Sequence, residues 1–174
     1  MVAASALVFY GQAIDIEIKT RAESNRVEIT GKFIDGDDIR NIAFEREFAG
    51  VSGLAERISG MKFTAADGRE VAFKVFAPGE YLASGPVKGF SYTVRLDPPA
   101  RTGQAHVSWL KNGRGLYFLR DLLPLALGGA SQEARIVLSG GDASPFFGGC
   151  YMPSDDGTLI CDNRSRAMLA RSKD

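Results

Sequence analysis

Apolar and charged residues alternate strictly near the start of the chain. Residues 14–19 read IDIEIK, which places three isoleucines on one face of a strand and the charged side chains on the other. After turn residues at 24–25, the apolar positions within 27–33 continue the same period of two. The two segments predict an antiparallel pair of strands with one face buried and the other in water.

Further short segments with strand-like composition follow at close intervals, and Asn112-Gly113 between two of them is a strong signal for a tight hairpin. Four apolar residues at helical spacing between 51 and 58, followed by Gly60, predict one short helix near 51–59. The expected fold is therefore mostly β, an antiparallel β-sandwich with one short helix near 51–59. The remaining strands are predicted at 42–48, 71–76, 90–96, 105–110, 115–119, 134–138 and 159–162.

The length of 174 residues fits one domain, and 45% hydrophobic residues can fill one core. Residues 2–10 are apolar and precede small residues at 11–13, as at the end of a signal peptide, although no basic region precedes them. We expect 1–13 to be a signal remnant or a flexible N-terminus, and 14–163 to form a single β-sandwich domain. Residues 164–174 are expected to be a basic tail or linker. This division favours a secreted or periplasmic location.

Overall charge argues against a nucleic-acid partner. Lysine plus arginine and aspartate plus glutamate each total 21, which gives a formal net charge of zero. Proteins that bind nucleic acid generally present a basic surface to the phosphates. No apolar run approaches the ~20 residues of a membrane-spanning helix, so no membrane span is predicted.

The sequence carries no recognisable catalytic set. His106 is its one histidine, and a single histidine cannot supply a two-histidine metal site. We interpret His106 as a structural, hydrogen-bonded residue; the alternative is a general base for which the sequence indicates no partner. Nucleophile and phosphate-binding motifs are absent, and the acidic segment 35–38 does not follow the EF-hand pattern. We expect no catalytic residue, no metal and no cofactor.

Aromatic residues provide the candidate binding positions besides His106. Trp109 lies beside the predicted hairpin and could form part of a surface that binds peptide or sugar; core packing is the alternative. Phe146 and Phe147 lie between Pro145 and a glycine pair. Adjacent phenylalanines in such a loop either close the end of the core or dock a partner.

Cys150 and Cys161 lie eleven positions apart, with turn signals at 153 and 155–157 between them. Two strands folding back at that turn would bring the cysteines close enough to form a disulfide, and two buried free thiols are the alternative. The spacing is not that of a zinc site or a CxxC redox motif.

The order of several stretches resembles the N-terminal domain of the glycyl-aminopeptidase family of zinc metallopeptidases, over roughly half to two-thirds of the chain. One of these stretches, 90–94, follows that family's aromatic-x-Tyr-x-Val pattern. The resemblance implies a β-sandwich that precedes a catalytic domain. The family's chemistry depends on a His-Glu-x-x-His helix and a downstream glutamate, and this sequence, with one histidine, does not contain that motif. The similar stretches are 53–58, 66–70, 78–81, 90–94, 106–110, 121–124 and 135–138.

Three hypotheses follow. The first is a non-catalytic N-terminal accessory domain that packs against a catalytic domain of the same parent protein and exposes an apolar patch when that neighbour is removed. The second is a free-standing β-sandwich that binds peptide or carbohydrate through Trp109 and the Phe146-Phe147 loop. The third is an enzyme that uses His106 with a carboxylate or a cysteine, which would require a cleft that holds the pair together.

Overall fold

Strands dominate the part of the chain that the structure, a computed structural model, describes. This part comprises residues 14–34, 38–98, 107–111, 114–125, 133–139, 150–151, 159–162 and 168–171. Within it the strands form several sheets, and the one α-helix has four residues, so the predicted mostly β class is confirmed.

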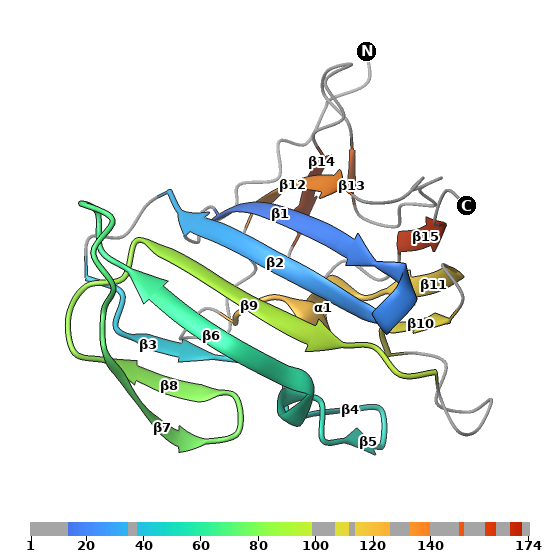
Figure 1. The fold of residues 1–174 in the computed structure, drawn as a ribbon, viewed down its shortest axis with the longest axis horizontal. Helices are drawn as coiled ribbons and strands as arrows, with labels where there is room; N and C mark the ends of the chain where they lie inside the picture. The colour runs from blue at the N-terminus through green and yellow to red at the C-terminus, as the bar shows by residue number, and fades with distance from the viewer. Residues whose placement is uncertain are drawn as a thin grey trace, which may run out of the picture.

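The largest sheet has seven strands in the order β13-β14-β12-β1-β2-β9-β6 (Figure 1). Its pairings are antiparallel except between β1 and β12, which run parallel with Ile14 opposite Ala134 and Lys19 opposite Ser139. The members are β1 (Ile14–Arg21), β2 (Arg26–Phe33), β6 (Ile58–Thr64), β9 (Gly89–Arg95), β12 (Glu133–Ser139), β13 (Cys150–Tyr151) and β14 (Leu159–Asp162).

The alternation at the start of the chain produces the central pair of this sheet. Residues 14, 16, 18 and 20 of β1 are buried, and so are residues 27, 29, 31 and 33 of β2. The two strands pair antiparallel from Ile14 opposite Phe33 to Arg21 opposite Arg26. The predicted hairpin, with one buried face and one face in water, is confirmed.

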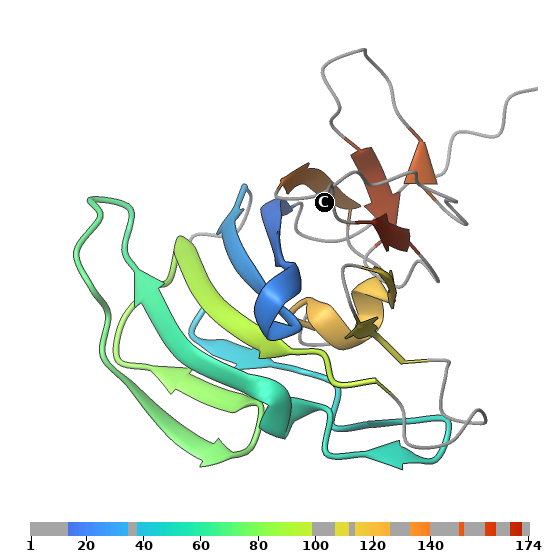
Figure 2. The same cartoon turned by 45° about the vertical axis from the view of Figure 1, so that its right-hand side comes forward.

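A second layer covers the buried face of the large sheet (Figures 1 and 2). It contains the three-stranded sheets β3-β8-β7 and β10-β11-β15, the two-stranded sheet β4-β5, and the helix α1 (Leu119–Leu122). The strands are β3 (Asn41–Ala43), β4 (Glu47–Phe48), β5 (Val51–Ser52), β7 (Phe73–Ala77), β8 (Glu80–Ala83), β10 (Trp109–Lys111), β11 (Arg114–Tyr117) and β15 (Met168–Arg171).

Aromatic rings hold the two layers together. The Phe44 ring lies edge-on to Tyr92 of β9 with centroids 5.0 Å apart, and Phe63 of β6 meets Phe73 of β7 at 5.1 Å. Such edge-to-face pairs are worth about 0.5–1.5 kcal/mol beyond their buried area. The Tyr92 hydroxyl donates to the carbonyl oxygen of Leu122 at 2.7 Å, which ties the large sheet to the end of α1.

The predicted helix near 51–59 is wrong in position and length. Residues 51–52 form β5, only Ala55–Arg57 make a turn of 3-10 helix (η2), and β6 begins at Ile58. Gly53 has a φ of +77°, which an α-helix cannot contain, and the Leu54 N–H donates to the carbonyl of Arg46 rather than within a helix. The one α-helix of the described residues lies at 119–122 instead.

The strand predicted at 42–48 is wrong as a single element, because β3 ends at Ala43 and β4 begins only at Glu47, in a different sheet. The other predicted strands agree in place with observed strands. Lys111 of β10 pairs with Arg114 of β11, so the predicted two-residue hairpin connection is confirmed, although Asn112 and Gly113 themselves lie outside the described residues. The sequence did not predict β6, β8 or β15. Strand β15 pairs with β11 and falls within the segment 164–174 that was expected to be a tail or linker. Residues 1–13 lie outside the described part.

Candidate functional site

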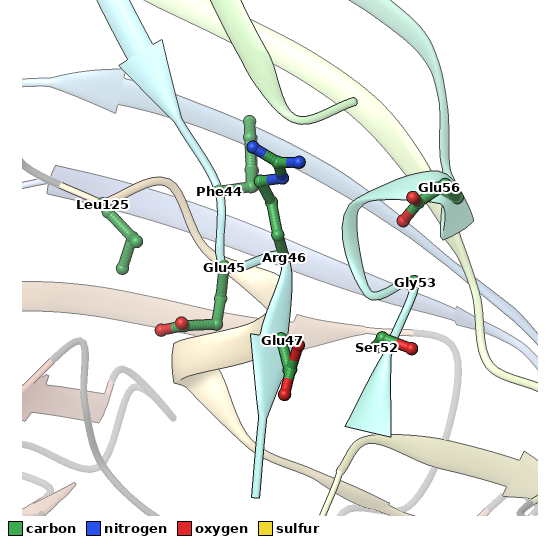
Figure 3. A pocket seen from close by; sticks show the side chains of 8 residues that line it. All are labelled: Phe44, Glu45, Arg46, Glu47, Ser52, Gly53, Glu56 and Leu125. Carbon is green, nitrogen blue, oxygen red and sulfur yellow. The ribbon is translucent and has the colours of Figure 1, made fainter. Parts of the chain in front are cut away.

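A pocket of about 520 Å³ lies beside the end of β3, and it is the candidate site that the described residues form (Figure 3). Segment 44–47 forms one side and segment 52–56 the other, with Leu125 from the turn after α1 at its edge. Its lining residues are Phe44, Glu45, Arg46, Glu47, Ser52, Gly53, Glu56 and Leu125.

Backbone hydrogen bonds position the three segments. The Leu125 N–H donates to Ala43 O at 2.8 Å, and the Leu54 N–H donates to Arg46 O at 3.1 Å. On the opposite side of Phe44, its own N–H donates to Gly79 O at 2.9 Å. Segment 52–56 is bonded to its neighbour 44–47, and the bonds to Gly79 and Leu125 join that pair to distant parts of the chain, so the shape of the pocket depends on tertiary structure.

The lining is acidic, with three glutamates and one arginine. Arg46 donates to Glu80 at 3.3 Å, and Glu45 accepts from Arg120 at 2.8 Å while the Arg120 guanidinium lies 4.8 Å from the centre of the Phe48 ring. Glu47 and Glu56 are exposed. Two of the four charges are therefore already engaged in ion pairs.

The pocket holds no set of groups for covalent catalysis. Ser52 is its one hydroxyl, and neither a histidine nor a cysteine lines it. No group of three or more potential metal ligands occurs among the residues that the structure describes. The described residues also contain no helix with the length and apolarity to cross a membrane. What this lining can do chemically is bind a cationic or hydrogen-bond-donating group without reacting with it.

The residues singled out from the sequence lie away from this pocket or outside the described residues. His106, Phe146 and Phe147 belong to the undescribed segments, so their roles stay predictions. Trp109 begins β10 and is partly buried, and its Nε1 atom is shielded from solvent without a hydrogen-bond partner. The indole N–H is therefore not presented on the surface as a donor.

The backbone brings the two cysteines together. β13 and β14 pair antiparallel, with Cys150 directly opposite Cys161 and Tyr151 opposite Ile160. The fold-back that the sequence predicted between the cysteines is thus present in the backbone, and the disulfide itself stays a prediction.

A buried ionic network, which the sequence did not indicate, joins η2, Ser108 just before β10, and α1. The Asp121 side chain is 2% exposed and accepts from the Ser108 N–H at 2.8 Å and from the Ser108 hydroxyl at 2.5 Å. Arg57, at 14% exposed, lies 3.1 Å from the same carboxylate and also donates to the carbonyl oxygens of Leu54 and Ser108. Since Arg57 follows Glu56, the network fixes one wall of the pocket.

The chain is similar to known proteins in its fold, but not at the level of a family model or a curated sequence. No protein-family model and no curated protein sequence matches the chain. Among solved structures, an aminopeptidase N family protein from Idiomarina loihiensis is similar with a TM-score of 0.66 and 12% identity. An M1 zinc metallopeptidase from Deinococcus radiodurans aligns with a TM-score of 0.41 and 12% identity, and the alignment covers 92% of this chain and 41% of that one. The yeast LTA4 hydrolase aligns with a TM-score of 0.35 and 10% identity, over 92% of this chain and 28% of that one.

The Idiomarina alignment covers 90% of this chain but 29% of the other protein. The chain therefore spans less than a third of the length of the structure that it resembles. At 12% identity the similarity shows a shared fold, a β architecture that also occurs within the much longer chain of an aminopeptidase N family protein.

Proposed function

We propose that this chain is a non-catalytic N-terminal accessory domain of a secreted or periplasmic metallopeptidase-like protein, and that it packs against a catalytic domain of the same parent protein. The observation that carries the proposal is the coverage of the fold likeness, 90% of this chain against 29% of an aminopeptidase N family protein. The sequence resemblance to the N-terminal domain of glycyl-aminopeptidases supports the same placement, and the candidate pocket has no catalytic group.

An exposed apolar surface on β7 supports the proposal. β7 is the outer strand of the sheet β3-β8-β7, at the lower left of Figure 1. Val75 and Phe76 on this strand are 58% and 68% exposed. The register shifts between Val75 and Ala77, which makes Phe76 an extra, bulged residue. A bulge redirects a side chain, and an exposed apolar edge strand is usually covered or otherwise protected.

We assign β7 to the surface that contacts the catalytic domain. Adjacent exposed apolar side chains on an uncovered edge strand are typical of sites where another protein surface docks. The burial of Val75 and Phe76 in the parent protein would then remove an aggregation-prone edge.

The first test is to sequence the source gene beyond the codon for Asp174. We expect the reading frame to continue into a second domain that contains a His-Glu-x-x-His sequence. A stop codon directly after Asp174 would contradict the proposal, and the free-standing module that binds peptide or carbohydrate would take its place. That alternative predicts that a peptide or oligosaccharide raises the melting temperature of the chain.

The second test compares variants in the longer protein. Phe76→Ser should loosen the contact and increase the rate of proteolytic cleavage between the two domains at least several-fold. Lys62→Ser, at an exposed polar position on β6, is the matched control and should leave that rate unchanged. If the two variants behave alike, β7 does not form the contact.

The chain of residues 1–174 alone should not hydrolyse aminoacyl substrates, with or without added zinc.

A further inference from the structure

The hairpin of β13 and β14 closes one edge of the seven-stranded sheet. β13 contains two residues, Cys150 and Tyr151, and among the named strands it pairs only with β14. The register joins Cys150 to Cys161 and Tyr151 to Ile160. Two residue pairs are a short ladder for a strand at the edge of a sheet.

This register meets the backbone requirement for a disulfide. Directly opposite residues of an antiparallel pair have Cα atoms about 4.5 or 5.5 Å apart, depending on their hydrogen-bonding position, and their Cβ atoms leave the sheet on the same face. A disulfide needs a Cα separation of about 4.4–6.8 Å, so either position in the ladder is suitable. A slip of one residue would direct the two cysteines to opposite faces.

We propose that Cys150 and Cys161 form an intramolecular disulfide that fixes β13 to β14. Each thiol loses its proton, and the sulfur–sulfur bond forms as two electrons pass to an external disulfide compound, which is reduced to two thiols. The proposal concerns this chain alone and does not depend on an accessory role. An oxidising compartment would supply the disulfide compound.

The bond would restrict a loop of twelve residues, from Cys150 to Cys161. Loop-closure entropy for that length corresponds to a factor of about 100 in the equilibrium between the closed and the opened hairpin. Amide protons of β13 and β14 should therefore exchange with solvent about 100-fold more slowly in the oxidised protein than in the reduced protein, as long as local opening governs the exchange.

The experiment starts from the fully reduced 174-residue chain. The chain is incubated with oxidised glutathione, denatured, and labelled with a maleimide before and after reduction. We expect no label before reduction, two labels afterwards, a monomeric product, and a peptide pair that contains both cysteines linked in the mass spectrum. Two free thiols, two glutathione adducts or a dimer linked between chains would overturn the proposal.

A register control has the same number of cysteines. In the double variant Ile160→Cys with Cys161→Ser, the second cysteine occupies the register position opposite Tyr151 instead of the one opposite Cys150. Because successive side chains of a strand alternate between its faces, this shift should disfavour the bond. The fraction of chains with the intramolecular disulfide should be at least tenfold lower in this variant than in the natural sequence, and the thiols should form glutathione adducts instead. Equal bond formation in both proteins would show that the register does not direct the pairing. The outcome is independent of any catalytic domain, so it separates this inference from the proposed function.

Discussion

Replacing Asp121 by asparagine removes the negative charge from the buried network that joins η2, Ser108 and α1. The carboxylate accepts from the Ser108 N–H and hydroxyl and lies 3.1 Å from the Arg57 guanidinium. Asparagine retains one acceptor oxygen and replaces the other with an NH₂ group, which would face a donor. Arg57 would keep its bonds to carbonyl oxygens but lose its counter-charge.

The expected loss of stability follows from these contacts. Removing one partner of a buried ion pair costs about 3–5 kcal/mol, and a lost hydrogen bond to a charged group about 1.5–3 kcal/mol. Because asparagine keeps the shape and one acceptor, we expect Asp121→Asn to lower the free energy of unfolding by about 3 kcal/mol. This is a large part of the 5–15 kcal/mol that typically holds a domain together.

Urea unfolding followed by circular dichroism at neutral pH measures this loss, provided that the slope of the transition is unchanged. The control is Asp67→Asn, which removes an ion pair with Arg69 that is exposed to solvent, and it should not shift the midpoint measurably. The double variant Arg57→Met with Asp121→Asn should cost less than the sum of the two single changes, by about 1–3 kcal/mol. A loss below about 1 kcal/mol for Asp121→Asn would refute the view that the network is a buried, coupled unit.

Three further changes test other parts of the fold. Gly31→Ala should destabilise by about 1–3 kcal/mol in thermal or urea unfolding, because its Cβ would lie 2.5 Å from Cε2 of the buried Phe90 ring. Phe76→Ser in the isolated chain should change the unfolding free energy by less than about 0.5 kcal/mol in the same assay, because that ring is mostly exposed. Burial raises the pKa of Tyr117 from 10.0 to about 12. The contribution of Tyr117 to the free energy of unfolding is therefore fully present below pH 10 and is lost as the pH rises to about 12. Within that window stability should fall by up to about 1.4 kcal/mol per pH unit for this group, and Tyr117→Phe should reduce the slope by that amount in an alkaline unfolding series.

Gly85→Ala is the matched control for Gly31, since a Cβ at Gly85 meets nothing within 4 Å, and equal losses at both positions would exclude the ring clash as the cause. A large loss for Phe76→Ser would mean that the ring packs within this chain. An unchanged alkaline slope in Tyr117→Phe would mean that Tyr117 titrates as readily in the folded state as in the unfolded state.

The alternation of apolar and polar residues was sufficient to predict a strand from the sequence where one face of that strand is uniformly buried. β1 and β2 bury every second residue, so the sequence shows them directly. β6 escaped prediction because Phe63 is its one fully buried residue and a register shift between Ser59 and Lys62 interrupts its alternation. The apolar spacing at 51–58 is that of a helix, but Gly50 and Gly53 have positive φ and the Leu54 N–H donates to the carbonyl of Arg46, so a short strand and a single turn form there instead.

The candidate pocket had no signal in the sequence. It combines the segments 44–47 and 52–56 with Leu125, which lies about seventy positions further along the chain, and no motif marks such a combination. The Arg57–Asp121 pair is equally remote in sequence. The fold-back between the two cysteines could be predicted, because in contrast to the pocket its strands and its turn signals all lie within a dozen consecutive residues.

The parallel pairing of β1 with β12 has a consequence for synthesis of the chain. Ile14 and its partner Ala134 differ by 120 in residue number (134 − 14), whereas the antiparallel partner β2 follows β1 almost at once. At about 5–20 residues per second, a ribosome needs several seconds or more to make β12 after β2. During that delay β1 is an unprotected edge strand, so pausing or premature termination before residue 133 would leave nascent chains prone to associate through β1 and in need of a chaperone.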